Sequence, residues 1–566
     1  MDKELLKQKP FYLSDSEVEW VYDTLNGLTE EEKIGQLFCV NIREGSVEEL
    51  DNFYKIIPYG GVMYRPLDME SAVTLSNHIK KAKVPMFIAA DLERGGQGVL
   101  TNGTKMANQM QITAAGNKKT EYVKKLAQVC ADEGKSVGVN WAFAPDVDID
   151  LNYRNPITNV RTYGSNPVDV ALLGATFISN LQKDGIAATA KHFPGDGVDD
   201  RDHHLVTNVN TLSTAEWDET YGKVYKACID AGVMSVMVGH IMQPAYSKLL
   251  NPEIEDKDIL PATLSKELMQ GLLRNKLGFN GLIVTDATTM SGFTIPMPRK
   301  LSVPTTIAAG ADVFLFSRNM EEDVAFMKEG YKNGIITPQR LDEAVTRILA
   351  MKAHLKLYEK QETEYSVEKA RKEVGKKEYH QWARELADDS ITLVKEEEGV
   401  LPLSPQKYPK IMYYPIETAG YDGFLNKAQT FKQMLEKEGF QVSEFNPSKG
   451  MEGFLAPTTD YIGKYDLMLY FACVSTRSNQ TTVRIQWAEP LGANCPHYLT
   501  SIPTVFISVE NPYHLQDVPR IRTYINAYSA HQEVLDEVLE KIMGRSEFKG
   551  VSPCDPFCGR WDTRLQ

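Results

Sequence analysis

Eight short apolar runs alternate with longer helical stretches between residues 35 and 316, and this alternation restricts the fold more than any other feature. The pattern is typical of βα units, whose strands pair in parallel because each return passes through a helix. Right-handed connections then determine the topology. We expect strands at residues 35–40, 60–64, 85–91, 139–146, 185–192, 233–240, 281–286 and 311–316. Eight such strands predict an N-terminal (β/α)8 TIM-type barrel in a protein of the α/β class.

Polar residues lie at the carboxyl ends of these predicted strands. Asp91 ends the third, Asp146 the fourth, Lys191 and His192 the fifth, His240 the sixth and Asp286 the seventh. Barrel enzymes build their active sites at this end of the strands. The agreement in position therefore predicts a catalytic site here.

The densest polar stretch is KHFPGDGVDDRDHH, residues 191–204, which follows the fifth strand. Its PGDG segment is a strong turn signal, so a loop is expected to follow. In that loop Asp202 precedes His204 by two residues, and a carboxylate so placed can hold an imidazole as a general acid and base. If this segment is extended, His203 points elsewhere, because side chains alternate faces in an extended chain. Taken alone, the loop fits a solvated acidic segment equally well.

KHFPG followed by Asp-x-His resembles glycoside hydrolase family 3, in particular its β-N-acetylglucosaminidase-like branch with a His–Asp acid/base dyad. The segment LLRNKLGFNGLIVTD, residues 272–286, is similar to the family pattern around the catalytic nucleophile. The resemblance implies a retaining enzyme with Asp286 as nucleophile, His204 as acid/base and Asp202 orienting His204. The rival acid/base candidates, Glu489 and Glu510, follow the many family members that use a carboxylate from a later domain.

The resemblance also implies substrate-binding roles. The matching residues are Asp91, Arg161, Lys191, His192 and His240, and Met290 is added because it follows the proposed nucleophile by four residues, although core packing explains it equally well. Two positions depart from the family pattern. Asp196 replaces a second histidine, and Arg94 interrupts the usual Asp-x-Glu-Gly-Gly.

The expected reaction removes one β-linked glucosyl or N-acetylglucosaminyl unit from a non-reducing end and passes it to inorganic phosphate or water. An imidazole acid/base would not repel phosphate as a carboxylate would. The alternatives left open are a strict hydrolase that does not use phosphate and a non-catalytic sugar-binding protein. A metal site among the histidines is a further alternative, but the sequence contains no HExxH motif and no cysteine-rich ligand set. We predict no metal and no cofactor, with phosphate as a candidate co-substrate.

Three parts are expected along the 566 residues: the catalytic barrel at 1–355, a charged helical linker at 356–388 and an α/β (αβα) sandwich at 389–566. Residues 389–405 resemble the entry to the second domain of family 3 proteins. The role of this domain and the oligomeric state are left open.

Charge and cysteine content predict partners and location. With 62 basic and 76 acidic residues the net charge is −14, which argues against nucleic-acid and anionic-membrane partners. No apolar run reaches the roughly 18 residues that a membrane span requires. The absence of a signal peptide and of a CxxC pair among seven cysteines favours reduced thiols and a cytoplasmic location, although Cys554 and Cys558 could form a bridge.

Overall fold

The computed structural model describes residues 2–359, 364–417, 426–446 and 455–565. The chain divides into two compact units. The first comprises Met1–Met106, Val123–Asn155 and Pro167–Tyr379, and the second Ala107–Tyr122, Pro156–Asn166 and His380–Gln566. Each unit is described by itself.

The first unit contains a closed barrel of parallel strands, as the apolar runs predict. Its strands are β1 (Cys39–Ile42), β2 (Gly61–Tyr64), β3 (Phe87–Ala90), β4 (Trp141–Ala142), β5 (Thr189–Phe193), β7 (Ser235–Val238) and β9 (Leu282–Thr285). They pair in the orders β1-β2-β3-β4 and β5-β7-β9. Bridges join Trp141 to Ala187, Val284 to Val313 and Phe38 to Phe314, so residues 313–314 act as the eighth strand. The predicted barrel is confirmed.

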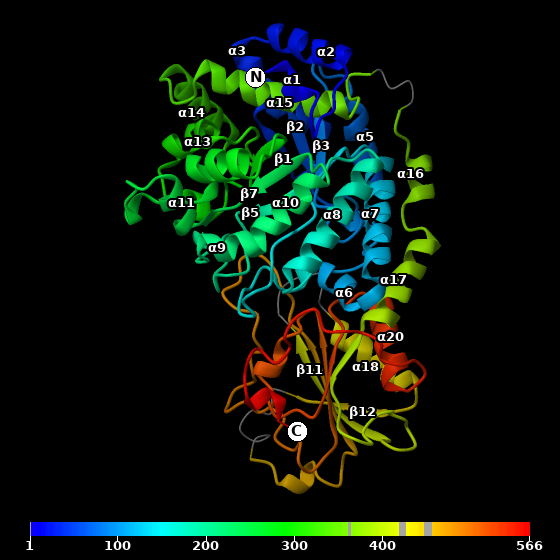
Figure 1. Ribbon diagram of the computed structural model, residues 1–566. Coiled ribbons are helices and arrows are strands. Elements are labelled where there is room, and N and C mark those ends of the chain that lie inside the picture. Colours follow the sequence, from blue (N-terminus) through cyan, green and yellow to red (C-terminus); the bar gives the residue numbers. More distant parts are fainter. Residues whose placement is uncertain (1, 360–363, 418–425, 447–454, 566) are drawn as a thin grey trace. The chain divides into compact units, whose positions relative to one another are not determined.

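Helices surround these strands in Figure 1. They are α1 (Lys3–Leu6), α2 (Asp15–Asn26), α3 (Glu30–Gln36), α4 (Val47–Ile56), α5 (Met69–Ile79), α7 (Lys119–Ser136), α8 (Pro167–Lys183), α9 (Thr214–Trp217), α10 (Lys223–Asp230), α11 (Pro244–Leu250), α12 (Ser291–Thr294), α13 (Arg299–Ala309), α14 (Met320–Lys332), α15 (Pro338–His354) and α16 (Val367–Glu373). The first strand begins later than predicted because a Thr29–Glu32 capping box starts α3 at Glu30. The small sheet of β6 (Asn208–Val209) and β8 (Ile241–Met242) completes the strands described in this unit.

Two short helices precede β9. Thr263 lies in the 3-10 helix η6 (Ala262–Leu264), and the π-helix η7 (Glu267–Lys276) starts after it. Ser265 accepts a hydrogen bond from the backbone N–H of Leu268, at 3.2 Å. The hydroxyl of Thr263 is therefore available for a contact with the site, described below.

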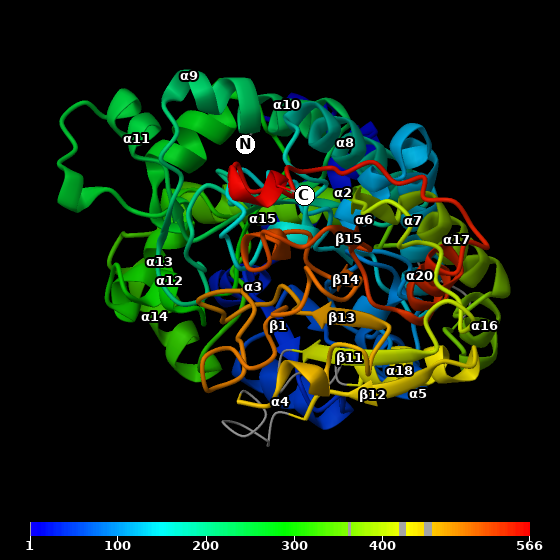
Figure 2. The same ribbon diagram turned by 90° about the horizontal axis from the view of Figure 1, so that it is seen from below.

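The second unit is built on one six-stranded sheet, visible in Figure 2. Its order is β10 (Thr392–Lys395), β15 (Thr523–Asn526), β14 (Thr504–Val509), β13 (Leu467–Cys473), β11 (Lys410–Glu417) and β12 (Gln441–Glu444), with only β10 antiparallel. Separate hydrophobic clusters cover its two faces. One contains residues of α17 (Lys377–Ser390), α18 (Lys427–Lys437) and α20 (Gln532–Ile542). The other draws on irregular segments, through Val483, Ile502 and Val518.

Two short segments of the N-terminal half belong to this second unit, which the division at residues 355 and 389 does not anticipate. They carry α6 (Gln109–Ala114) and the 3-10 helix η3 (Asn159–Arg161). Asn108 donates its side-chain amide to Glu510 at 2.9 Å, and Lys118 pairs with Asp389 at 2.8 Å. Contacts between residues so far apart in the sequence cannot be predicted from the local periodicity of apolar residues.

Within the described ranges, no helix has the length and apolar character needed to cross a membrane. The seven cysteines all lie within the described residues and none forms a disulfide, so the bridge considered between Cys554 and Cys558 is not found.

Candidate active site

The residues predicted at the strand ends lie at one edge of the barrel. Asp91 directly follows β3, Lys191 and His192 lie within β5, and Asp286 directly follows β9. Because parallel strands end at the same rim, these side chains converge there. The rim therefore carries the groups that the sequence analysis singled out.

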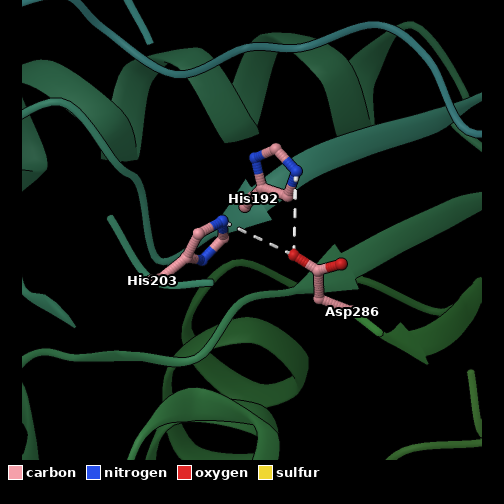
Figure 3. Close-up of side chains that lie close together, drawn as sticks. All are labelled: His192, His203 and Asp286. Carbon is pink, nitrogen blue, oxygen red and sulfur yellow. Dashed lines mark ion pairs between the residues drawn. The ribbon is translucent and has the colours of Figure 1, made fainter. Parts of the chain in front are cut away.

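Asp286 is surrounded by imidazoles. Its Oδ1 accepts a hydrogen bond from the backbone N–H of Ala287 at 2.6 Å. Its Oδ2 lies 3.7 Å from Nε2 of His203 and 3.9 Å from Nε2 of His192, and both lines in Figure 3 end on this oxygen. Burial alone would raise the pKa of the Asp286 carboxyl, but the neighbouring histidines lower it well below its usual value. Asp286 is therefore an ionised carboxylate with one oxygen facing the rim.

His192 is oriented by a carboxylate that the sequence analysis did not select. Its Nδ1 lies 2.7 Å from Oδ2 of Asp148, and its backbone N–H donates to Oδ1 of the same residue at 3.1 Å. Since a carboxylate only accepts, Nδ1 carries a proton and Nε2 is the nitrogen that faces Asp286. The sequence held one signal for Asp148. Asp146, Asp148 and Asp150 alternate after the fourth strand, and alternate residues of an extended segment are expected on one face.

The predicted dyad is present. Nδ1 of His204 lies 2.7 Å from Oδ1 of Asp202, and the side chain of His204 retains 24% of its exposure, so its Nε2 edge can exchange a proton with a ligand. Although burial opposes it, the bond to His204 lowers the pKa of the Asp202 carboxyl. Gly292 lets this loop pack closely, since a Cβ there would lie 2.4 Å from the carbonyl oxygen of His203.

The expectation that His203 points away from the site is wrong. The carbonyl of Asp202 accepts hydrogen bonds from the N–H groups of Leu205 and Val206, so the segment is a turn and the alternation of an extended chain does not apply. His203 is fully buried, and its ring lies edge-on to those of His192 and His204. Burial lowers the pKa of His203 well below its usual value. A neutral imidazole therefore lies between the dyad and Asp286.

A second charged cluster lies beside β3 and β5. The Lys191 ammonium group is buried, 2.5 Å from Oε1 of Glu93 and 3.3 Å from Oδ1 of Asp91. The half-exposed Arg65, directly after β2, reaches the other oxygen of Asp91 at 3.4 Å. Asp91 and Lys191 are thus brought together as predicted, whereas Glu93 and Arg65 are additions.

Asp196, which replaces the second histidine of the family pattern, stabilises the loop through buried hydrogen bonds. Its carboxyl is buried and accepts hydrogen bonds from the side-chain amide of Asn155 at 2.8 Å and the N–H of Gly197 at 2.6 Å. Its own N–H donates to Asp148 at 2.7 Å. Burial, and then the charge of Asp148, raise the pKa of Asp196 to about 8. The residue is therefore a neutral, structural carboxylic acid at neutral pH.

His240 and Met290 are both buried. Nε2 of His240 donates to the carbonyl of Ala287 at 3.0 Å, and Nδ1 accepts from the hydroxyl of Thr263 at 3.1 Å. His240 therefore holds the backbone that follows Asp286. Contact of His240 and Met290 with the sugar stays a prediction.

The remaining predicted residues fall in the second unit. Arg161 ends η3, and Glu489 and Glu510 follow in the C-terminal part of the same unit. Glu510 is buried and accepts the Asn108 amide described above. Their proposed roles stay predictions.

One group of side chains on the rim has the geometry of a metal-binding set. His192, His203 and Asp286 each offer a ligand atom, all within 4.8 Å of one another. A cation bound there would occupy the oxygen of Asp286 that faces the rim. The expectation that the enzyme uses no metal therefore has a direct chemical test.

Comparison with known proteins agrees with these motifs. The model of the glycosyl hydrolase family 3 N-terminal domain matches residues 29–351. A protein of Cellulomonas fimi called β-N-acetylglucosaminidase/β-glucosidase is 48% identical over 565 residues, which cover 99% of this chain and 100% of the relative. The structure of β-glucoside phosphorylase BglX matches with a TM-score of 0.93, 43% identity and 100% coverage of both chains.

A more distant structure shares the fold. It is a family 3 β-N-acetylglucosaminidase from Paenibacillus sp. str. FPU-7, with a TM-score of 0.79 and 24% identity over 94% of this chain and 100% of that one. The family resemblance inferred from the loop motifs is thus confirmed. The chain is an enzyme of the glycosidase type and belongs to glycoside hydrolase family 3.

Proposed function

We propose that this enzyme is a retaining, exo-acting β-glycosidase that passes a β-glucosyl or β-N-acetylglucosaminyl unit to inorganic phosphate, with water as a competing acceptor. The observation that carries the proposal is the hydrogen bond between His204 and Asp202, beside an ionised Asp286. The pair supplies a proton donor and the carboxylate a nucleophile, which are the two groups a double displacement requires.

In the first step an oxygen of Asp286 attacks the anomeric carbon while the bond from that carbon to the leaving oxygen breaks. His204 gives the leaving oxygen a proton from Nε2, because Nδ1 is committed to Asp202. In the second step an acceptor oxygen attacks the same carbon, the acceptor's proton passes to Nε2 of His204, and Asp286 departs as a carboxylate. Two inversions leave the configuration of the sugar unchanged.

Sugar hydroxyls are proposed to bind to Asp91, Lys191 and His192. The first two already form an ion pair network, and charge-assisted hydrogen bonds of this kind orient a ligand strongly. Arg161 is kept as a further candidate on its motif alone.

Phosphate is favoured as acceptor by the chemistry of the acid/base. After the first step a carboxylate in that position would be anionic and repel phosphate, whereas the imidazole of His204 is neutral. The relative named β-glucoside phosphorylase shares 43% of its residues with this chain over its whole length. A cytoplasmic location, expected from the cysteines, would supply phosphate in abundance.

The deciding experiment measures release of the aryl group from an aryl β-glucoside and an aryl β-N-acetylglucosaminide, with and without phosphate, and identifies the sugar product. We expect phosphate to accelerate release and to yield a sugar 1-phosphate of retained configuration. Free sugar released at an unchanged rate would instead establish a strict hydrolase. No turnover of either glycoside would contradict the proposed substrate class.

A further inference from the structure

His203 is the one histidine of the rim whose ring nitrogens have no hydrogen-bond partner among the described residues. The side chain is fully buried, and its Nε2 lies 3.7 Å from Asp286, beyond hydrogen-bond distance. A neutral imidazole still carries one N–H, and a buried donor left without an acceptor costs free energy. The site is therefore incomplete at this position until a ligand supplies an acceptor.

The neighbouring His192 has the opposite hydrogen-bonding character. Its Nδ1 proton is held by Asp148, so in the neutral ring Nε2 is an acceptor. The rings of His192 and His203 lie edge-on, with centroids 5.2 Å apart, and both Nε2 atoms face Oδ2 of Asp286. An acceptor and a donor thus flank the same carboxylate oxygen.

Asp286 specifies which part of the sugar this pair meets. Its Oδ1 is bound to the N–H of Ala287, which leaves Oδ2 as the oxygen free to attack. Once the anomeric carbon lies against Oδ2, the hydrogen-bonding substituent on the adjacent carbon, C2, is nearer to the attacked atom than any other ring hydroxyl. Hydrogen bonds to a 2-hydroxyl strengthen in the transition state of glycosidases.

We propose that His203 is the residue that recognises the C2 substituent, donating its N–H to an oxygen on that substituent while a proton of the same group is donated to His192. This inference rests on the proposed function, because it takes Asp286 as the nucleophile. The expected substrates are β-glycosides that carry a hydrogen-bonding group at C2, and 2-deoxy glycosides are expected to react more slowly.

The test is a cycle of two substrates and two enzymes. The kcat/KM values of an aryl β-glucoside and its 2-deoxy analogue are measured, without phosphate, for the wild type and for His203→Phe, which keeps an aromatic ring and removes the N–H. The ratio of kcat/KM for the glucoside to kcat/KM for its 2-deoxy analogue is compared between the two enzymes. The difference in intrinsic reactivity between the two substrates is the same for both enzymes and therefore cancels. We expect the preference for the glucoside to fall about tenfold in the variant, the effect of one lost hydrogen bond. His203→Gln, which retains an amide donor, should recover part of it.

An equal loss on both substrates would overturn the proposal, since it would mean that His203 serves Asp286 or the fold. An unchanged preference would overturn it as well. If His203→Phe does not fold, as judged by thermal unfolding, the same cycle is run with His203→Leu, which also removes the N–H. The control is His354→Ala in α15, which should leave the preference unchanged. Nδ1 of His354 lies 2.7 Å from the carbonyl oxygen of Phe11. Failure of the proposed function would appear separately, as a wild type inactive on every glycoside.

Discussion

His204 donates two hydrogen bonds to a single oxygen of Asp202: its backbone N–H lies 2.8 Å, and its ring Nδ1 2.7 Å, from Oδ1. The hydrogen bond from the backbone N–H fixes the position of the His204 main chain. The hydrogen bond from Nδ1 fixes the orientation of the ring and leaves Nε2 as the nitrogen that does not contact Asp202. The short Asp-x-His spacing thus sets both the position and the tautomer of the imidazole.

Asp202→Asn should slow glycosides with poor leaving groups far more than activated ones. The amide removes the charge that stabilises the protonated imidazole, and it can impose the wrong tautomer on His204. We expect kcat/KM for an alkyl β-glycoside to fall by about 100-fold or more, the usual size of general acid catalysis. A dinitrophenyl glycoside needs no proton and should lose much less. Equal losses on both substrates would contradict the assignment of the dyad.

Asp286→Ala should abolish turnover with every leaving group, because it removes the carboxylate that is proposed to form the covalent intermediate. A fall in kcat of about four orders of magnitude is expected. Sugar binding by calorimetry and thermal unfolding should change little. Asp230→Ala, an exposed aspartate at the end of α10, is the matched control and should retain full activity. If Asp286→Ala keeps more than about one hundredth of the rate, another group is the nucleophile.

Extended dialysis against a chelator should leave activity unchanged. His192, His203 and Asp286 could bind a transition metal, but a cation there would occupy Oδ2 of Asp286 and block its attack. The measurement is turnover before and after chelation, together with metal analysis of the protein. Activity that is lost with the metal and restored by adding it back would replace the double displacement with metal-assisted chemistry.

The barrel and the dyad were predictable because both depend on local patterns. Apolar runs of strand length predict the barrel strands β1, β2, β3, β4, β5, β7 and β9, and Asp202 and His204 need only their spacing. The family match added Asp286, which the structure places at the end of β9.

The residues that were missed depend on the turn or on distant packing. His203 faces Asp286 only because residues 202–206 form a turn, and no alternation rule anticipates that. Asp148 orients His192 across 44 positions of sequence, and Glu93 pairs with Lys191 across an even longer stretch. Residues 107–122 and 156–166 join the second unit through contacts of the same kind. Periodicity carries no information about such pairs.

Asp196→Asn should change how stability depends on pH. In the unfolded chain this carboxyl has an ordinary pKa near 3.8, whereas in the folded protein burial and Asp148 raise it to about 8. Between these values the folded state holds a proton that the unfolded state has released. The free energy of unfolding therefore falls as pH rises through this window, and the contribution of Asp196 is complete only below about pH 4. The amide does not titrate and resembles the protonated acid, so the variant should lose this part of the slope. Thermal unfolding of both proteins at pH 5 and pH 8 checks this: the variant should gain stability relative to the wild type at pH 8. Parallel curves for the two proteins would show that Asp196 is ionised in the folded state.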